Sequence, residues 1–224
     1  MILSNQKEVL FEQIREYIEK YNVLSLLDIG AGDGVLAKRL AEKVKDYTAV
    51  EEKEGNIQKL KKLGLVVVPR LFPCEINGEF DMVLSCHSIP EQGDLYLPFL
   101  KKAWGLVKEG GIFLVVTFKG GEGDIVQLRE GFLKRLEPVD KELFDEVMGI
   151  LKQFGTPIIK RVKSKFFSND SKEIVEIASN SIGGSPEEKA KYKDKLDKLI
   201  LSAHKENGKY FFPFEHLFIL VEKK

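Results

Sequence analysis

Cysteine and histidine are scarce in this chain of 224 residues, which has only Cys74, Cys86 and three histidines. The two cysteines show neither the spacing of a zinc site nor the pattern of a disulfide framework, so we expect both to be reduced thiols. No group of Cys, His and Asp has metal-ligand spacing, and we predict no bound metal. Reduced cysteines are typical of the cytoplasm, which is the expected location.

The chain also lacks a net charge and a long apolar segment. Its 35 Lys and Arg residues balance 35 Asp and Glu residues, so no overall field attracts nucleic acid and we expect no such partner. The longest apolar runs, Ile112–Phe118 and Leu217–Val221, have the length of strands, whereas a membrane helix needs about 20 residues. The amino terminus does not resemble a signal peptide. We therefore expect no membrane association, and the sequence leaves the oligomeric state open.

The composition is that of one globular α/β domain, with 43% hydrophobic and 31% charged residues. Apolar spacing in the first half predicts helices and strands in alternation. The predicted elements are helix 5–21, strand Val23–Ile29, helix Val35–Val44, strand Tyr47–Val50, a helix around Leu60, strand Leu65–Val68, strand Phe80–Ser85, helix 95–107 and strand Ile112–Phe118. Alternation of this kind indicates crossover connections, and hence a parallel sheet with helices on both faces.

The pattern changes after Phe118, where three closely spaced glycines indicate a flexible exit from the strand. Start signals and apolar spacing predict four helices and two strands in the second half. They are helices 124–136, 140–153, 168–180 and 185–204, and strands Ile158–Phe167 and Leu217–Val221. We expect one of these strands to be an antiparallel edge strand on the parallel sheet.

The most informative stretch is Leu26–Gly34, which reads LLDIGAGDG at the carboxyl end of the first strand. Glycines there let backbone groups approach a ligand next to a helix N-terminus, the usual place for ligands in open α/β sheets. The second strand ends in Val50, and Glu51 follows it. A carboxylate at that strand end can accept hydrogen bonds from both hydroxyls of a ribose. The sequence therefore predicts a site for a nucleoside-containing ligand.

The glycine spacing separates two classes of nucleoside ligand. The dinucleotide fingerprint of nicotinamide and flavin enzymes needs glycines at its first, third and sixth positions. Counting from Gly30, the third position is Gly32 but the sixth is Val35, so the pattern is G-x-G-x-G. A nicotinamide or flavin cofactor is therefore not expected.

The turn after Leu-Asp-Ile, the acid Glu51, the strand Phe80–Ser85 and the sequence LVKEGG at Leu106–Gly111 together resemble the class I S-adenosylmethionine-dependent methyltransferase family, and are most similar to its small-molecule branch. The resemblance covers about residues 24–119. It implies an α/β, Rossmann-like parallel sheet with helical additions, S-adenosylmethionine as cofactor, S-adenosylhomocysteine as product, and a small-molecule acceptor.

The resemblance also implies a map of the chain, with residues 1–224 forming a single methyltransferase domain. Its parts are a cover helix at 1–22, a cofactor-binding half at 23–119, a helical insertion at 120–157, and carboxyl-terminal strands and helices at 158–224. We expect the first helix and the segment 121–155 to close over the acceptor pocket. Leu10, Ile14, Phe132 and Phe144 would supply the apolar faces that meet across the pocket mouth.

Site residues follow from the resemblance position by position. Asp28 would orient the glycine turn. The cofactor-binding set consists of Asp28, Gly30, Ala31, Gly32, Gly34, Glu51, Glu52, Arg70, Leu71, Ser85 and Cys86. Within this set, Glu51 would hold the ribose, with Glu52 beside the adenine edge, while Ser85 and Cys86 would lie beneath the sulfonium. The family's acid after the third strand is missing here, so backbone groups near Arg70 and Leu71 would contact adenine instead.

His87, just past the fourth strand, is the candidate catalytic base, because imidazole titrates near neutrality. The alternative is that it only stabilises a turn or packs under the cofactor, and His204 and His216 are interpreted as structural. The chain reads Ser85-Cys86-His87 where methylases of base amino groups carry an Asn/Asp-Pro-Pro-aromatic turn. Two functional alternatives remain: an RNA or protein methyltransferase, and a non-catalytic regulatory protein that binds S-adenosylmethionine.

Overall fold

The computed structural model describes residues 3–89, 96–118, 139–182 and 186–224. The chain divides into two compact units. The larger unit comprises residues 7–118, 143–162 and 216–224, and the smaller unit comprises residues 1–6, 119–142 and 163–215. The predicted single domain stays a prediction, and the predicted helix 124–136 lies outside the described residues.

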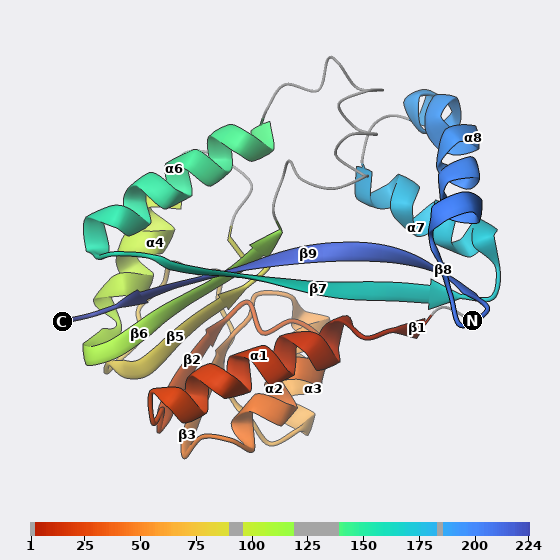
Figure 1. The fold of residues 1–224 in the computed structure, drawn as a ribbon. Helices are drawn as coiled ribbons and strands as arrows, with labels where there is room; N and C mark the ends of the chain where they lie inside the picture. Colours follow the sequence, from red (N-terminus) through yellow and green to blue (C-terminus); the bar gives the residue numbers. More distant parts are fainter. Residues whose placement is uncertain (1–2, 90–95, 119–138, 183–185) are drawn as a thin grey trace. The chain divides into compact units, whose positions relative to one another are not determined.

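A sheet of mostly parallel strands forms the larger unit (Figure 1). Its strands are β2 (Ser25–Ile29), β3 (Asp46–Val50), β4 (Val66–Val68), β5 (Phe80–Cys86), β6 (Val107–Phe118), β7 (Ile158–Ser168) and β9 (Lys209–Glu222). Residues 163–168 of β7 and 209–215 of β9 belong to the smaller unit. They are ordered β7-β9-β6-β5-β2-β3-β4. Neighbouring strands in the segment β6-β5-β2-β3-β4 are parallel to each other, whereas β9 runs antiparallel to β6. The expected α/β fold class is confirmed.

Helices cover both faces of this sheet because successive strand residues point to opposite sides. Leu26 packs with α1 (Gln6–Lys20) and α2 (Val35–Ala41), and Leu60 of α3 (Glu54–Lys62) joins the same cluster. Leu27, its neighbour on β2, packs on the other face with α4 (Tyr96–Gly105) and α6 (Val139–Phe154). Figure 1 shows α1 and α2 on one face of the central strands and α4 on the other.

Two strands differ from the expectation in position. The antiparallel strand β9 has neighbours on both sides, whereas the sequence interpretation placed an antiparallel strand at the edge. Its run Leu217–Val221 is fully buried, and a continuous apolar run is typical of a strand covered on both faces. Strand β6 begins at Val107, five residues earlier than predicted, because Val107 already pairs with Phe80 of β5.

The smaller unit has its own core, formed by the helices α7 (Ser171–Ile182) and α8 (Pro186–Ala203). Buried residues of this core are Ile174, Val175, Ala178, Leu196, Ile200 and Phe212. Within the same unit, β1 (Leu3–Ser4) pairs antiparallel with β7, and β8 (Lys205–Glu206) pairs antiparallel with β9. Sequence reasoning missed β1 and β8, which are two-residue strands without periodicity of their own.

Candidate functional site

The parallel register of the sheet brings the candidate site residues to one edge. Ile29, the last residue of β2, pairs with Val50 of β3 and with Ser85 of β5. Gly30 and Glu51 therefore emerge side by side where their strands end. This edge is also the amino-terminal side of α2, so the predicted turn, acid and fourth-strand residues meet in space.

The glycine turn depends on left-handed backbone conformations. Gly30, Gly32 and Gly34 have φ angles of 76°, 63° and 83°, which residues with a Cβ rarely adopt. The amides of Gly30 and Ala31 both donate to the carbonyl oxygen of Val50, at 2.8 and 3.2 Å. These bonds hold the start of the turn against the end of β3.

Close packing adds a second reason for glycine at two of these positions. A Cβ on Gly30 would lie 2.4 Å from the Ser88 Cβ, and a Cβ on Gly34 would lie 3.0 Å from the Leu63 Cδ1. Chain segments from β5 and α3 thus pack directly on the backbone of the turn. The turn is a fixed part of the structure on these two sides.

Glu51 is only 7% exposed, and three backbone amides donate to its carboxylate. The Gly32 amide lies 2.8 Å from Oε2, while the amides of Lys53 and Glu52 lie 2.9 and 3.1 Å from Oε1. The acid therefore connects the end of β3 with the glycine turn. Glu52, which the sequence also placed in the site, points its exposed side chain to solvent.

Asp28 is buried on β2, where the Tyr47 hydroxyl donates to its Oδ2 atom at 2.6 Å. Burial raises the pKa of Asp28 to about 6, although the bond from Tyr47 and the charge of Lys7 act in the opposite direction. The hydrogen bond from Tyr47 thus connects the Asp28 side chain to the neighbouring strand β3. The role implied by the resemblance, orientation of the glycine turn, stays a prediction.

Ser85 and Cys86 end β5 below the turn. The Ser85 and Ser88 hydroxyls lie 2.9 Å apart, and the Ser88 hydroxyl also donates to the carbonyl oxygen of Ile29. Burial raises the pKa of the Cys86 thiol to about 12, and the nearby Asp28 charge adds to the shift. Cys86 therefore stays a neutral thiol at physiological pH.

His87 follows β5 in a left-handed conformation, with φ of 55°. Its amide donates to the Val116 carbonyl oxygen at 2.8 Å, and its Nε2 atom lies 3.1 Å from the Nδ1 atom of His216. His216 is fully buried on β9. Burial, together with the charges of His216 and Lys7, lowers the pKa of His87 to about 3, and burial lowers that of His216 to about 4.

Lys7, at the start of α1, supplies a positive charge to this region. Its ammonium lies 3.5 Å from the Asp33 carboxylate in the glycine turn. The same charge lowers the pKa values of Asp28, Cys86 and His87. Lys7 is thus the cation that acts on several site residues at once.

Two further sets of predicted residues complete the comparison, and the adenine contacts expected from the backbone near Arg70 and Leu71 stay a prediction. Arg70 and Leu71 follow β4 with exposed side chains, Leu71 being 64% exposed, and the Arg70 amide donates to the Val68 carbonyl oxygen. Leu10 and Ile14 of α1 were predicted to face the pocket mouth. Both side chains are instead buried in the core between α1 and the sheet. Phe132 lies outside the described residues, and the side chain of Phe144 is not described.

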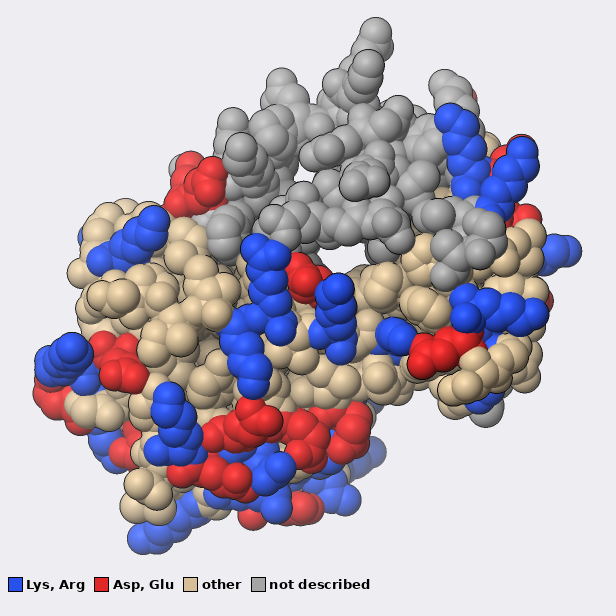
Figure 2. Space-filling view, viewed as in Figure 1, with Lys and Arg blue, Asp and Glu red and all other residues tan. Residues whose placement is uncertain are grey.

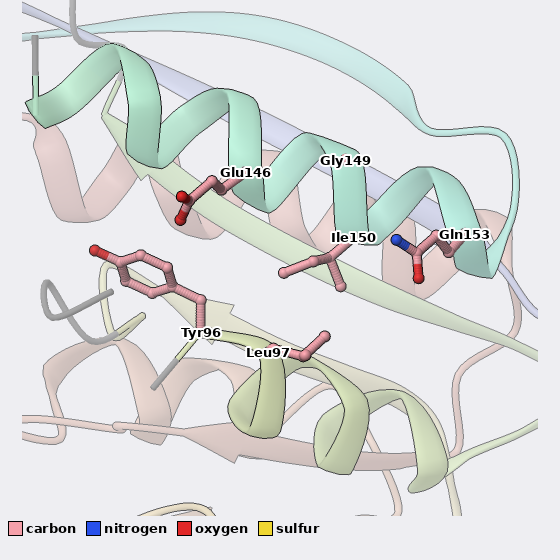
Figure 3. A pocket seen from close by; sticks show the side chains of 6 residues that line it. All are labelled: Tyr96, Leu97, Glu146, Gly149, Ile150 and Gln153. Carbon is pink, nitrogen blue, oxygen red and sulfur yellow. The ribbon is translucent and has the colours of Figure 1, made fainter. Parts of the chain in front are cut away.

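A shallow groove of about 260 Å³ lies between α4 and α6 (Figure 3). Its lining residues are Tyr96, Leu97, Glu146, Gly149, Ile150 and Gln153. Figure 3 shows Tyr96 and Leu97 on α4 facing Glu146 and Ile150 on α6. A second groove, of about 600 Å³, includes Trp104, Phe154 and Lys223. Neither includes the glycine turn, where backbone and carboxylate contacts hold the strand ends together.

Sequence reasoning missed four residues that contact the predicted ones: Lys7, Tyr47, Ser88 and His216. Tyr47 could have been predicted from the sequence. Alternate residues of a strand share a face, so Tyr47 lies on the same face of β3 as Ala49, and Ala49 pairs with Asp28. For His216 no local signal existed, since it lies 129 positions from His87. Its partner follows only from the pairing of β9 with β6.

Comparison with known proteins agrees with this geometry. Residues 27–115 match a family profile described as a methyltransferase domain. Residues 27–115 therefore form a methyltransferase domain. The predicted family, that of S-adenosylmethionine-dependent methyltransferases, is thereby confirmed, and the matched segment of this methyltransferase runs from β2 to β6. A comparison with curated proteins finds no match.

Solved structures share the fold of this methyltransferase at low identity. YcgJ from Bacillus subtilis is 14% identical, with a TM-score of 0.61 over 96% of this chain and 97% of YcgJ. A candidate methyltransferase from Bacillus halodurans is 16% identical, with a TM-score of 0.59 over 95% and 98%. The N-methyltransferase NodS from Bradyrhizobium japonicum, solved with S-adenosyl-L-homocysteine, is 11% identical, with a TM-score of 0.55 over 95% and 86%.

The described part of the methyltransferase has neither a metal-binding cluster nor a membrane-spanning helix. Among those residues, no group of three or more His, Cys, Asp or Glu side chains could hold a metal ion. No helix built from them is both long enough and apolar enough to span a bilayer. Cys74 and Cys86 are free cysteines.

Proposed function

We propose that this methyltransferase transfers the methyl group of S-adenosylmethionine to a small-molecule acceptor, at the edge where β2, β3 and β5 end. The observation that carries the proposal is the buried Glu51 carboxylate held 2.8 Å from the Gly32 amide. A carboxylate beside a glycine turn offers acceptors for ribose hydroxyls and open backbone for the methionine part of the ligand.

The residues present fit this cofactor. A carboxylate has about four lone-pair sites, and three backbone amides donate to Glu51, so it can accept a further hydroxyl. A second hydroxyl would compete with the Gly32 amide and free that donor for the ligand. At Gly32, a Cβ would have only the Gly30 carbonyl oxygen within 4 Å, at 3.9 Å, so the backbone of the turn is open there.

The cofactor supplies a methyl group on a positively charged sulfur, and its transfer is an in-line displacement. The chain's task is alignment, because fixed geometry can remove several kcal/mol from such a barrier. In the proposed arrangement, Gly30, Ala31 and Gly32 bind the methionine part, Glu51 holds the ribose, and Ser85 and Cys86 form the floor. The neutral Cys86 thiol is a poor nucleophile, so it does not compete for the methyl group.

The paired charges on α1 support a small-molecule acceptor. The free thiols of Cys74 and Cys86 support a cytoplasmic location. Acidic side chains on α1 are paired, with Glu8 bound by Arg39 at 2.6 Å and Glu16 bound by Lys160 at 3.0 Å. Figure 2 shows acidic and basic side chains interspersed over α1. A nucleic-acid substrate would favour a broad basic groove beside the site instead.

The proposal is tested by incubating the protein with radiolabelled-methyl S-adenosylmethionine and a cell extract. The extract is separated beforehand into small molecules and macromolecules. We expect label on a compound of the small-molecule fraction, and none with the Glu51→Ala variant. Label on RNA or protein alone would replace the small acceptor by a macromolecule, and no transfer from a protein that binds the cofactor would favour a regulatory role.

A further inference from the structure

Lys7 is a base beside the glycine turn that the proposed function does not use. Its ammonium lies 3.5 Å from the Oδ1 atom of Asp33. The same oxygen accepts the Val35 amide at 3.2 Å, at the start of α2. Asp33 therefore keeps a hydrogen-bond donor when the Lys7 ammonium moves to another acceptor.

An ion pair between α1 and α2 holds the backbone of Lys7 in this place. The Arg39 guanidinium on α2 donates to both carboxylate oxygens of Glu8, at 2.6 and 3.0 Å. It also lies 3.7 Å from the ring centroid of the buried Phe11 on α1. Bidentate pairs of this kind fix direction as well as distance. Because Glu8 follows Lys7 directly in the first turn of α1, the Lys7 backbone is fixed near the turn that leads into α2.

The side chain of Lys7 is held less firmly than its backbone. The side chains of Lys7 and Asp33 are 49% and 46% exposed, and an ion pair as exposed as this one contributes little to stability. A lysine ammonium sits on a long, flexible stem and has three donor hydrogens. Lys7 can therefore leave Asp33 at small cost for an anion that enters the site.

The charge of Lys7 also reaches the residues below the turn. It lowers the pKa values of Asp28 near the end of β2, of Cys86 at the end of β5, and of His87 after it. The ammonium thus acts on both the turn and the floor of the proposed cofactor site. An anionic group bound between them lies within the same electrostatic range.

A ligand with a carboxylate needs such a cation here. Asp28, Asp33 and Glu51 place three acidic side chains in or beside the turn. A carboxylate that is buried without a partner is costly, and nearby acids increase that cost. The cofactor of the proposed function carries one carboxylate, in the methionine part assigned to the glycine turn.

We propose that Lys7 binds the carboxylate of S-adenosylmethionine, exchanging the Asp33 carboxylate for that of the ligand, and thereby selects ligands that carry this group. The proposal rests on the proposed function and adds a residue of α1 to its cofactor site. Lys7 lies before the segment 27–115 that matches the family profile, so the profile does not assign it.

The test compares S-adenosylmethionine with its decarboxylated form, which keeps the adenosine, the sulfonium and the amine. In titration calorimetry, wild type should bind the carboxylated ligand at least about tenfold more tightly, the scale of one charged hydrogen bond. Lys7→Met should abolish this preference, whereas Lys7→Arg should keep it. Lys38→Met, which changes an exposed lysine on α2, is the matched control and should bind both ligands like wild type.

Asp33→Asn provides a second measurement, in which affinity should rise. Asparagine keeps an oxygen for the Val35 amide but no longer attracts Lys7 as an ion. We expect S-adenosylmethionine to bind about two- to fivefold more tightly, the scale of an exposed ion pair. The double variant with Lys7→Met should show no such gain over Lys7→Met alone. An unchanged or lower affinity in Asp33→Asn would mean that Asp33 does not compete with the ligand for Lys7.

The outcomes separate this proposal from the proposed function. A lost preference in Lys7→Met, with the decarboxylated ligand bound no less tightly, supports the role of Lys7. A retained preference in Lys7→Met, an equal weakening of both ligands, or no preference in wild type would overturn that role and leave the proposed function standing. If wild type binds neither ligand, the proposed function itself fails.

Discussion

The Oε2 atom of Glu51 accepts the amide hydrogen of Gly32 at 2.8 Å, which ties the end of β3 to the glycine turn after β2. This bond connects two features that are 19 positions apart in the sequence and that were predicted to serve one ligand. Since three amides already donate to this carboxylate, a second ligand hydroxyl at Glu51 would compete with the Gly32 amide. Ligand binding and the conformation of the turn should therefore be coupled.

Replacing Glu51 by Ala is expected to weaken binding of S-adenosylhomocysteine at least about tenfold, because it removes a charged acceptor whose hydrogen bonds contribute about 1.5–3 kcal/mol each. Titration calorimetry measures the effect. Glu54→Ala, which changes an exposed acid in the first turn of α3, is the matched control and should bind like wild type. An unchanged dissociation constant in a folded Glu51→Ala protein would show that this acid does not hold the ligand.

Gly30→Ala is expected to destabilise the protein more than Gly64→Ala, although both glycines have φ near 75°. The shared left-handed conformation costs roughly 1–2 kcal/mol for a residue with a Cβ. At Gly30 the new Cβ would also lie 2.4 Å from the Ser88 Cβ, whereas nothing lies within 4 Å at Gly64. Urea unfolding gives the difference, and equal losses would mean that the contact with Ser88 relaxes freely.

Asp28 makes stability depend on pH in a defined direction. Its folded-state pKa of about 6 lies above the value of 3.8 for a free side chain, so the folded protein binds the proton more tightly. This contribution to stability is present below about pH 4 and is lost as pH rises through about 6. Asp28→Asn should therefore gain on the order of 2–3 kcal/mol relative to wild type between pH 4 and pH 7.

Unfolding free energies measured across this range test the Asp28 prediction, with the exposed Asp46→Asn as control. Tyr47→Phe adds an internal check, because the Tyr47 hydroxyl donates to the Asp28 carboxylate and lowers its pKa. Carbon NMR of the carboxyl group should then show a higher pKa for Asp28 in Tyr47→Phe than in wild type. A constant difference between Asp28→Asn and wild type at all pH values would contradict a raised pKa.

Asp81, at the opposite end of the sheet, is expected to be structural. Its Oδ2 atom accepts the amides of Leu24 and Ser25 at 2.9 and 2.7 Å, and Lys108 lies 2.9 Å from Oδ1. Burial alone would raise the pKa of Asp81, but the bonds from Lys108, Ser25 and Leu24 outweigh it and lower the pKa. The stability that Asp81 contributes is therefore present above about pH 4 and lost as pH falls through the folded-state pKa.

Asp81→Ala should cost about 1–3 kcal/mol at neutral pH, because two amides at the start of β2 lose their acceptor. Lys108→Met is the comparison: it removes the partly exposed ammonium but leaves those amides bonded, and it should cost less. Thermal unfolding of both variants measures the two losses of stability. Equal losses would mean that the ion pair, and not the backbone bonds, carries the stabilisation.

Local patterns predicted much of the fold. Alternating apolar spacing identified β2 through β6 and their helices, because each strand or helix is buried against the sheet by its own residues. The glycine turn and Glu51 were also predictable, since strand ends in a parallel sheet share one edge. Helix α6 was predicted at 140–153 and observed at Val139–Phe154.

What sequence reasoning could not provide depends on long-range pairing. His216 was interpreted as structural because nothing near it in the sequence resembles a site, and only the register of β9 against β6 places it beside His87. The interior place of β9 was likewise missed, although its run of buried residues pointed to it. Lys7 lies on a helix that was predicted from apolar spacing, which carries no information about the charged side chain at its first turn.

The most direct test of the account is the choice of ligand at the glycine turn. Titration calorimetry of the purified protein with S-adenosylmethionine, S-adenosylhomocysteine and NADH compares the two ligand classes that the spacing from Gly30 to Gly34 separates. We predict saturable binding of both methyl-cycle ligands and none of NADH. Binding of NADH, with no heat from either S-adenosyl compound, would contradict the assignment of this turn to S-adenosylmethionine.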